Sequence, residues 1–234
     1  MQIFYAPLIN GDTYILDETE SRHCVKVLRM SRGDRVSLID GRGNLYEGKI
    51  IKPDSSGCII EIDQIISNFE KRDYHLHIAI SPLKNTDRFE LFIEKSVEMG
   101  IDEITPLLCA RTEKKNIKNE RVERVIISAM KQSIKACKTI LNEPVYFNEF
   151  IKKEFSGKKF IAHCDPGYEK KGIAEVYIKR ENALILIGPE GDFSSEEITL
   201  SEKHGYEPVH LGNSRLRTET AGIAACHSIY FINQ

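Results

Sequence analysis

Three ionisable side chains within five residues mark the stretch of this sequence most able to do chemistry. Arg215, Arg217 and Glu219 follow a short apolar run, residues 209–211, which ends at Gly212. Such a run predicts a strand, and ionisable groups at the carboxyl end of a strand are typical of functional sites. Ligands of open α/β sheets bind at this edge, where backbone N–H groups and helix starts converge. The pattern therefore favours a site for a small anionic or polar ligand.

A second glycine-rich turn lies upstream of the first. The apolar run 184–187 leads into Gly188-Pro189-Glu190-Gly191, and a helical pattern follows. This turn lacks the three glycines of a dinucleotide-binding loop and the Lys-Ser/Thr pair of a P-loop. Alone, it is more often a tight strand-to-helix connection than a ligand site. The two turns together predict that two strands end at one edge of a sheet and form a shared pocket there.

The two turns resemble the cofactor loops of a known family. Ile187-Gly-Pro-Glu-Gly191 and Leu211-Gly-(x)3-Leu216-Arg-Thr-Glu-Thr-Ala221 are similar to the motifs of SPOUT methyltransferases that modify uracil N3 in 16S ribosomal RNA. The resemblance implies a trefoil knot and an S-adenosylmethionine site. The implied cofactor-binding residues are Ile187, Gly188, Gly191, Leu211, Gly212 and Leu216.

Residue 192 departs from the family pattern, which usually has a second glycine after Gly191. Asp192 stands there in this sequence. Aspartate tolerates a positive φ better than most residues, so the turn can keep the backbone conformation that a glycine would adopt. The resemblance further implies a homodimer formed through the methyltransferase domain, with 16S rRNA or the small ribosomal subunit as the partner.

The chemistry of uracil N3 methylation suggests roles for three side chains. N3 carries a proton, and it becomes a good nucleophile only as that proton leaves. Arg217 is expected to stabilise the negative charge on a uracil carbonyl oxygen, while Glu219 or Glu190 accepts the proton or orients the base. Glu219 is equally well explained as an acidic residue in the first turn of a helix, where the dipole favours it. The reaction requires no metal ion.

Composition sets the class of the protein. The 234 residues are 41% hydrophobic and 29% charged, which is typical of one or two soluble globular domains. The formal net charge of −2 provides no overall attraction to nucleic acid, so RNA must bind to local patches. Neither a membrane span nor a leader is expected, and the predicted location is the cytoplasm. The six scattered cysteines lack the spacing of a zinc or disulfide framework.

The pattern of elements changes near residue 70. Short β-like runs at 2–5, 36–40, 45–51 and 58–65, with one helical piece from Asp17, predict a small β-barrel; the family resemblance makes it a PUA-like RNA-binding domain over residues 1–70. Residues 71–234 alternate strands and helices, which predicts an α/β domain with a mostly parallel sheet, covered on both faces. The resemblance makes this domain a SPOUT methyltransferase with its knot in the C-terminal part.

Basic residues are the candidates for contact with RNA. Arg22, Lys26 and Arg29 have i, i+4 and i+7 spacing, which predicts one side of a helix. Such a charged stripe is often only a solvated helix face. Clustered cations also bind RNA phosphates favourably, because this binding releases counterions. The family resemblance adds Lys84 and Arg111 as residues that face RNA.

Two other functions remain open from the sequence. One is a non-catalytic RNA-binding or ribosome-assembly protein of the same fold, in which the α/β part only dimerises. The other is an unrelated α/β enzyme that acts on a phosphate ligand, although the phosphate-binding motifs are missing. Saturable S-adenosylmethionine binding separates the methyltransferase from both.

Overall fold

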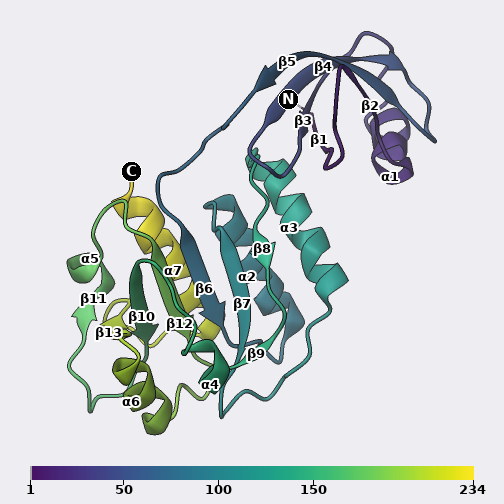
Figure 1. Cartoon of the computed structure of the whole chain (residues 1–234). Coiled ribbons are helices and arrows are strands. Elements are labelled where there is room, and N and C mark those ends of the chain that lie inside the picture. The colour runs from purple at the N-terminus through teal and green to yellow at the C-terminus, as the bar shows by residue number, and fades with distance from the viewer. Residues whose placement is uncertain (1) are drawn as a thin grey trace. The chain divides into compact units, whose positions relative to one another are not determined.

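The computed structural model describes residues 2–234, which divide into two compact units (Figure 1). The first comprises residues 2–71 together with Ile127–Lys138, and the second comprises Arg72–Ile126 and Thr139–Gln234. Over these described residues, every helix is too short or too polar to cross a lipid bilayer.

The first unit is built on a five-stranded sheet with the order β1-β3-β4-β5-β2. Its strands are β1 (Ile3–Tyr5), β2 (Thr13–Ile15), β3 (Arg35–Ile39), β4 (Leu45–Lys52) and β5 (Ile59–Ile66). β1 pairs with β3 in parallel, and the other neighbours are antiparallel. The four predicted strands are confirmed, whereas β2 was not anticipated. Phe4, Leu38 and Ile60 are buried in the core of this unit, which holds the sheet together.

The helix of the first unit differs from the prediction. α1 (Glu18–Arg22) follows its N-cap Asp17, where the sequence predicted a helical piece, and the Asp17 side chain accepts a hydrogen bond from the Glu20 N–H at 2.8 Å. The chain then widens into a π-helix, η1 (His23–Val27), and Arg29 follows its end with a φ of 56°. The prediction that Arg22, Lys26 and Arg29 share one side of an α-helix is therefore wrong, because the 3.6-residue period stops at Arg22.

The segment Ile127–Lys138 joins the first unit through specific contacts. Lys131 Nζ lies 2.5 Å from Oε1 of the buried Glu20, and Lys135 Nζ lies 2.7 Å from Glu70 Oε2. The Gly43 N–H donates to the Ala136 carbonyl at 3.0 Å. These polar contacts link residues more than sixty positions apart and attach the segment to the sheet of the first unit.

The second unit contains an eight-stranded sheet in which neighbouring strands run parallel, and this confirms the prediction of a mostly parallel α/β sheet. The order is β11-β13-β10-β12-β6-β7-β8, with β9 paired to β7. The strands are β6 (Leu76–Ile80), β7 (Glu103–Leu108), β8 (Ile140–Leu141), β9 (Val145–Tyr146), β10 (Lys158–Ala162), β11 (Lys171–Gly172), β12 (Ala183–Ile187) and β13 (Glu207–His210).

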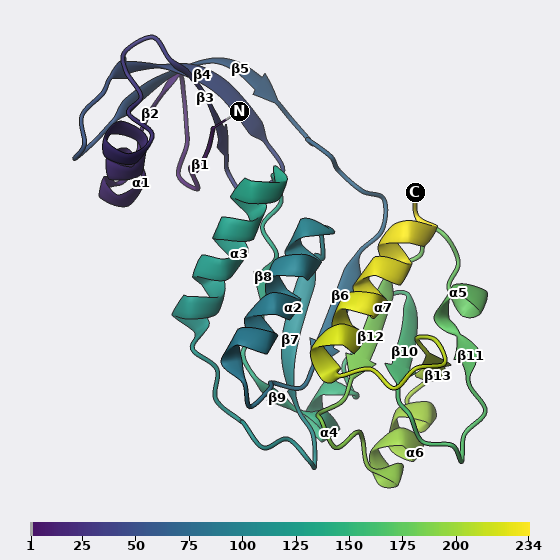
Figure 2. The same cartoon turned by 180° about the vertical axis from the view of Figure 1, so that it is seen from behind.

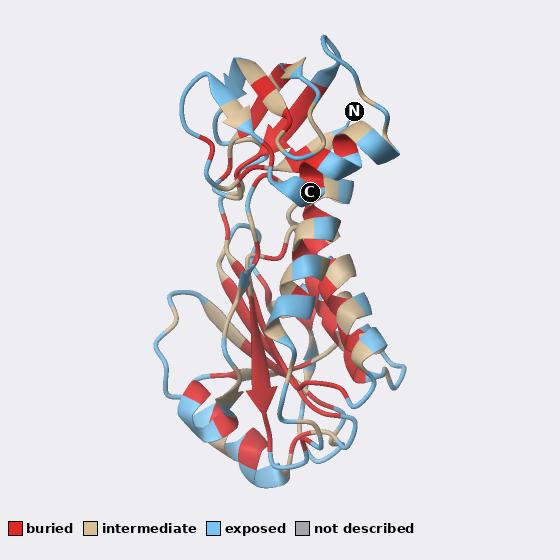
Figure 3. Cartoon of the chain, turned by 90° about the vertical axis from the view of Figure 1, so that its right-hand side faces the viewer, coloured by how far each residue is buried: buried red, intermediate tan, exposed pale blue. Residues whose placement is uncertain are grey.

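Helices cover both faces of this sheet, as expected. The helices are α2 (Thr86–Glu98), α3 (Asn119–Ser133), α4 (Phe147–Phe150), α5 (Ile173–Val176), α6 (Ser195–Lys203) and α7 (Thr218–Ile232). α2 and α7 lie side by side on one face, seen in Figure 2, and a Cβ on Gly222 would lie 2.6 Å from Phe92, so only glycine allows this approach. On the other face, Leu184 and Leu186 pack against α4 and α6. The strands between these layers are buried (Figure 3).

Candidate functional site

A pocket of about 1070 Å³ lies in the second unit where β10, β12 and β13 end. The loops that follow these three strands line it, together with Arg88 from α2 and Arg111 from the loop after β7. The two glycine-rich turns thus follow strands that flank β10, at the carboxyl edge predicted from the sequence. A cavity of this size can enclose a ligand as large as a nucleoside derivative.

Five of the six predicted cofactor-binding residues line this pocket. They are Ile187, Gly188, Leu211, Gly212 and Leu216. Gly191 is not among the lining residues; its carbonyl oxygen instead accepts a hydrogen bond from Arg111 Nη1 at 2.7 Å. Arg111 Nη1 also donates to the Phe193 carbonyl at 3.3 Å. Arg111 therefore fixes the backbone conformation of the loop at Gly191 through these two hydrogen bonds.

Two glycines are required by the shape of the loops. A Cβ on Gly188 would lie 3.0 Å from Cδ2 of the buried Phe193, so a side chain would displace that ring or the loop. Gly212 has a φ of 110°, a conformation that side-chain-bearing residues rarely adopt. Both glycines leave main-chain groups accessible along the wall of the pocket.

Asp192 replaces the usual glycine without changing the conformation that the loop needs. Its φ is 62°, in the left-handed region, as the sequence suggested for this position. One carboxylate oxygen accepts from the Cys164 N–H at 2.8 Å and the other accepts from the Phe193 N–H at 2.8 Å. The side chain thus links the loop after β12 to the loop after β10.

The three predicted catalytic side chains all line the pocket. Arg217 immediately precedes α7 and is exposed, whereas Glu219 lies in the first turn of α7 and is buried. Glu190 is exposed, and its Oε1 accepts from the Lys84 N–H at 3.4 Å. A cation and two carboxylates therefore converge on one cavity, as general acid–base chemistry on a bound base requires.

Sequence reasoning missed Arg88, which also lines the pocket. Its Nε lies 3.8 Å from Oε1 of Glu219, and its side chain is 43% exposed, so it can reach a ligand as well as the carboxylate. Arg88 stands in the first turn of α2, where the helix dipole disfavours a cation. That unfavourable placement is the signal that could have identified it from the sequence.

His163 is a second pocket residue that the sequence did not single out. It follows the end of β10 and is buried, and neither ring nitrogen makes a hydrogen bond within the part of the chain that the structure describes. Burial lowers the pKa of the His163 imidazole, which favours the neutral form of the ring. Its ring packs edge-on against Tyr168, 5.2 Å away between centroids.

The predicted RNA contacts are placed in both units. Arg111 lies at the pocket. Lys84 Nζ is 3.1 Å from Glu113 Oε2, and this highly exposed ion pair contributes little to stability. The Lys84 amine can therefore exchange Glu113 for a phosphate. Arg22, Lys26 and Arg29 are in the first unit, and Arg22 pairs with Glu18 at 2.7 Å.

Comparison with known proteins identifies the family. The RNA methyltransferase domain family matches residues 70–230, and the RNA methyltransferase PUA domain family matches residues 16–63. The ribosomal RNA small subunit methyltransferase E of Buchnera aphidicola (strain APS) is 31% identical over 224 residues, covering 91% of this chain and 85% of the relative. This chain belongs to the RNA methyltransferase family.

Solved structures of this methyltransferase family share the fold of the whole chain. The "probable rRNA-methyltransferase" of Porphyromonas gingivalis is 37% identical with a TM-score of 0.93, and the match covers 100% of this chain and 98% of the other. A Legionella pneumophila methyltransferase, solved with bound SAM, is 28% identical with a TM-score of 0.86 and covers 97% and 96%. The RNA methyltransferase family resemblance drawn from the two glycine-rich motifs is confirmed.

Proposed function

We propose that this protein transfers a methyl group from S-adenosylmethionine to N3 of a uridine in 16S rRNA of the small ribosomal subunit. One observation carries the proposal: both glycine-rich loops, Arg217, Glu219 and Glu190 line a single pocket in a chain of this methyltransferase family. The Legionella relative supports the choice of cofactor because it was solved with bound SAM.

The residues of the pocket fit S-adenosylmethionine. Ile187, Leu211 and Leu216 provide apolar walls for an adenine ring, and the bare backbones at Gly188 and Gly212 allow close approach of its polar edges and of the ribose. Main-chain groups of the two loops would hold the cofactor, which supplies an electrophilic methyl group when bound.

The side chains of the pocket would prepare the uracil. Glu219 or Glu190 accepts the N3 proton at a carboxylate oxygen, and Arg217 donates hydrogen bonds to the carbonyl oxygen where negative charge accumulates. The N-terminus of α7 adds the positive end of its dipole at the same place. Arg88 holds the Glu219 carboxylate in position through their 3.8 Å contact. In-line transfer would form the N3–methyl bond as the sulfur–methyl bond breaks, with S-adenosylhomocysteine as the leaving group, so it depends on positioning and needs no covalent intermediate with this chain.

The finer features of the family resemblance belong to this proposal. We assign residues 71–234 to a SPOUT domain with a trefoil knot formed by the loops at 188–193 and 212–217, and residues 1–70 to an RNA-binding PUA-like domain. Arg22, Lys26, Arg29, Lys84 and Arg111 contact RNA in this scheme. The protein acts as a homodimer through its methyltransferase domain, in the cytoplasm, where small ribosomal subunits are present.

Substitution of Gly188 tests the location of the cofactor site. Gly188→Val is expected to abolish measurable S-adenosylmethionine binding in calorimetry, because the new side chain meets Phe193 and fills the wall of the pocket. Gly57→Val is the matched control, since a Cβ at Gly57 meets its nearest atom at an ordinary 3.4 Å in the other unit. Thermal unfolding of both variants checks the fold. A folded Gly188→Val protein with wild-type affinity would place the cofactor elsewhere.

A further inference from the structure

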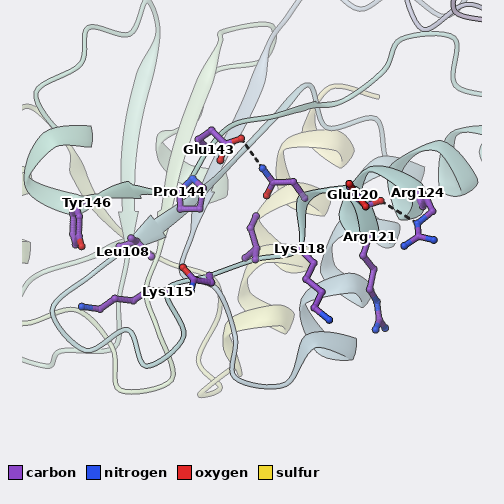
Figure 4. Close-up of a pocket in the computed structure, with 12 residues that line it drawn as sticks. Leu108, Lys115, Lys118, Glu120, Arg121, Arg124, Glu143, Pro144 and Tyr146 are labelled. Atoms are coloured by element: carbon purple, nitrogen blue, oxygen red, sulfur yellow. Dashed lines mark hydrogen bonds between the residues drawn. The ribbon is translucent and has the colours of Figure 1, made fainter.

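A second cavity, of about 1080 Å³, lies in the second unit beyond the carboxyl ends of β7 and β9. We refer to it as the basic groove, because Lys115, Lys118, Arg121 and Arg124 line it. Figure 4 shows Lys115 and Lys118 on the segment before α3 and Arg121 and Arg124 at the start of α3, together with Leu108 and Tyr146 from the two strands. The proposed methylation chemistry uses none of them.

The groove carries an excess of positive charge. Residues 111–124 contain six Lys and Arg side chains against three Glu side chains, in a chain whose formal net charge is −2. Arg121 is neutralised by ion pairs with Asp87 and Glu90. Lys115, Lys118 and Arg124 are exposed and take no part in the ion pairs formed within residues 2–234. Two carboxylates, Glu120 and Glu143, line the cavity as well, and Glu143 accepts a hydrogen bond from Asn119. The four Lys and Arg side chains of the lining outnumber these two carboxylates, so the cavity keeps an excess of positive charge that attracts a polyanion.

An aromatic side chain accompanies these cations. Tyr146 is 54% exposed, at the end of β9, and it lines the same cavity as the buried Leu108. An exposed tyrosine among unpaired cations is the combination by which proteins bind single-stranded nucleic acid: the cations contact phosphates and a base stacks on the ring. A duplex keeps its bases stacked inside, so a concave site with an aromatic wall suits an unpaired strand.

The basic groove and the methyltransferase pocket open on the same edge of one sheet. β7 is two strands from β12 in the sheet order, and all these strands run parallel, so their carboxyl ends point the same way. Arg111 lines the methyltransferase pocket and Lys115, four residues later, lines the groove. A strand that enters the pocket can therefore continue along this edge into the groove.

We propose that the basic groove binds a single-stranded stretch of the RNA substrate next to the target nucleotide, with phosphates on Lys115, Lys118 and Arg124 and a base stacked on Tyr146. The inference rests on the proposed function, since it takes rRNA as the substrate. It adds a substrate-binding surface separate from the cofactor pocket, and it requires the target uridine to lie in or beside an unpaired segment.

The test uses the full-length protein and two fluorescent probes, a ten-nucleotide oligouridylate and a ten-base-pair RNA duplex. The triple variant Lys115→Ala, Lys118→Ala, Arg124→Ala should flatten the log–log salt dependence of oligouridylate binding by about 2, at about 0.7 per lost phosphate contact of a single strand. Tyr146→Ala should weaken oligouridylate binding about 10-fold or more, and Tyr146→Phe should retain it, because the ring alone supports stacking. The duplex should be affected much less by either change.

A matched control removes the same charge elsewhere in the unit. Lys152, Lys171 and Lys203 are exposed and lie outside both cavities, so their triple alanine variant should leave the salt slope almost unchanged. Equal slopes for the two triple variants, or equal losses for oligouridylate and duplex, would overturn the proposal. S-adenosylmethionine affinity, measured on the same proteins, should stay at the wild-type value in every groove variant. If the groove variants bind oligouridylate like the wild type while the wild type binds the cofactor and methylates RNA, only the proposal for the groove is rejected. If the folded wild type does not bind the cofactor, the proposed function is rejected.

Discussion

Arg217→Ala is expected to slow methyl transfer at least about 10²-fold while S-adenosylmethionine affinity stays near the wild-type value. Arg217 lines the pocket from the residue before α7, so its guanidinium and the helix N-terminus act on the same anionic oxygen. Removing one preorganised donor from such a site typically costs 10²- to 10³-fold in rate. Because Arg217 acts only as charge develops on the uracil, its removal should not change the cofactor affinity that is measured without RNA.

Two further variants make the Arg217 result specific. Arg217→Lys keeps the charge without the planar fork and should recover part of the rate. Arg180→Ala removes an arginine of the same unit that is paired with Asp73 at 3.1 Å and lies outside the pocket, and its rate should match the wild type. Single-turnover measurements on 16S rRNA provide the rates. An Arg217→Ala enzyme within about three-fold of the wild type would remove this residue from the catalytic scheme.

Replacing the proton acceptor should produce the largest loss, about 10²- to 10⁴-fold in the single-turnover rate. Glu219→Gln and Glu190→Gln test the two candidates separately, since each keeps the side-chain shape and removes the carboxylate. Glu219 is buried beside Arg88, whereas Glu190 is exposed and accepts a hydrogen bond from the Lys84 N–H. The buried position shields Glu219 from competing solvent, so we expect the greater loss at Glu219.

The pH dependence distinguishes proton removal from charge stabilisation. If the substituted glutamate is the base, raising the pH should restore part of the rate, because hydroxide in solution then deprotonates uracil N3. Arg217→Ala should show less of this recovery, since its base is intact. Rates close to wild type in both Gln variants would mean that another group accepts the proton. A flat pH profile in the slower variant would assign that glutamate to positioning the uracil.

Strong local patterns in the sequence were sufficient to predict most of the parallel sheet. The alternation of strands and helices after residue 71 predicted a mostly parallel sheet, and the two glycine-rich turns were placed correctly at strand ends. The positive φ at Asp192 was also anticipated. By contrast, β8 and β11 have two residues each, and α4 and α5 have four, so none is long enough to show a period.

The features that the sequence did not reveal depend on contacts between distant residues. The π-helix of His23–Val27 has no distinguishing local pattern, and it displaced Arg29 from the predicted stripe. The carboxylate of Glu20 pairs with Lys131, 111 residues away, which no local pattern indicates. Arg88 belongs to the site only because α2 lies beside the first turn of α7. Tertiary packing, which local periodicity does not encode, decided each of these positions.

The most direct test of the proposed activity identifies the methylated atom. The purified protein would be incubated with S-adenosylmethionine that carries a deuterated methyl group and with small ribosomal subunits lacking 3-methyluridine. The rRNA would then be digested to nucleosides for mass spectrometry. We expect one deuterated methyl group per 16S rRNA, in 3-methyluridine, and far less label over the same short interval with Arg217→Ala. Label in another nucleoside, or no transfer by a folded wild-type protein that binds the cofactor, would contradict the assignment to uracil N3.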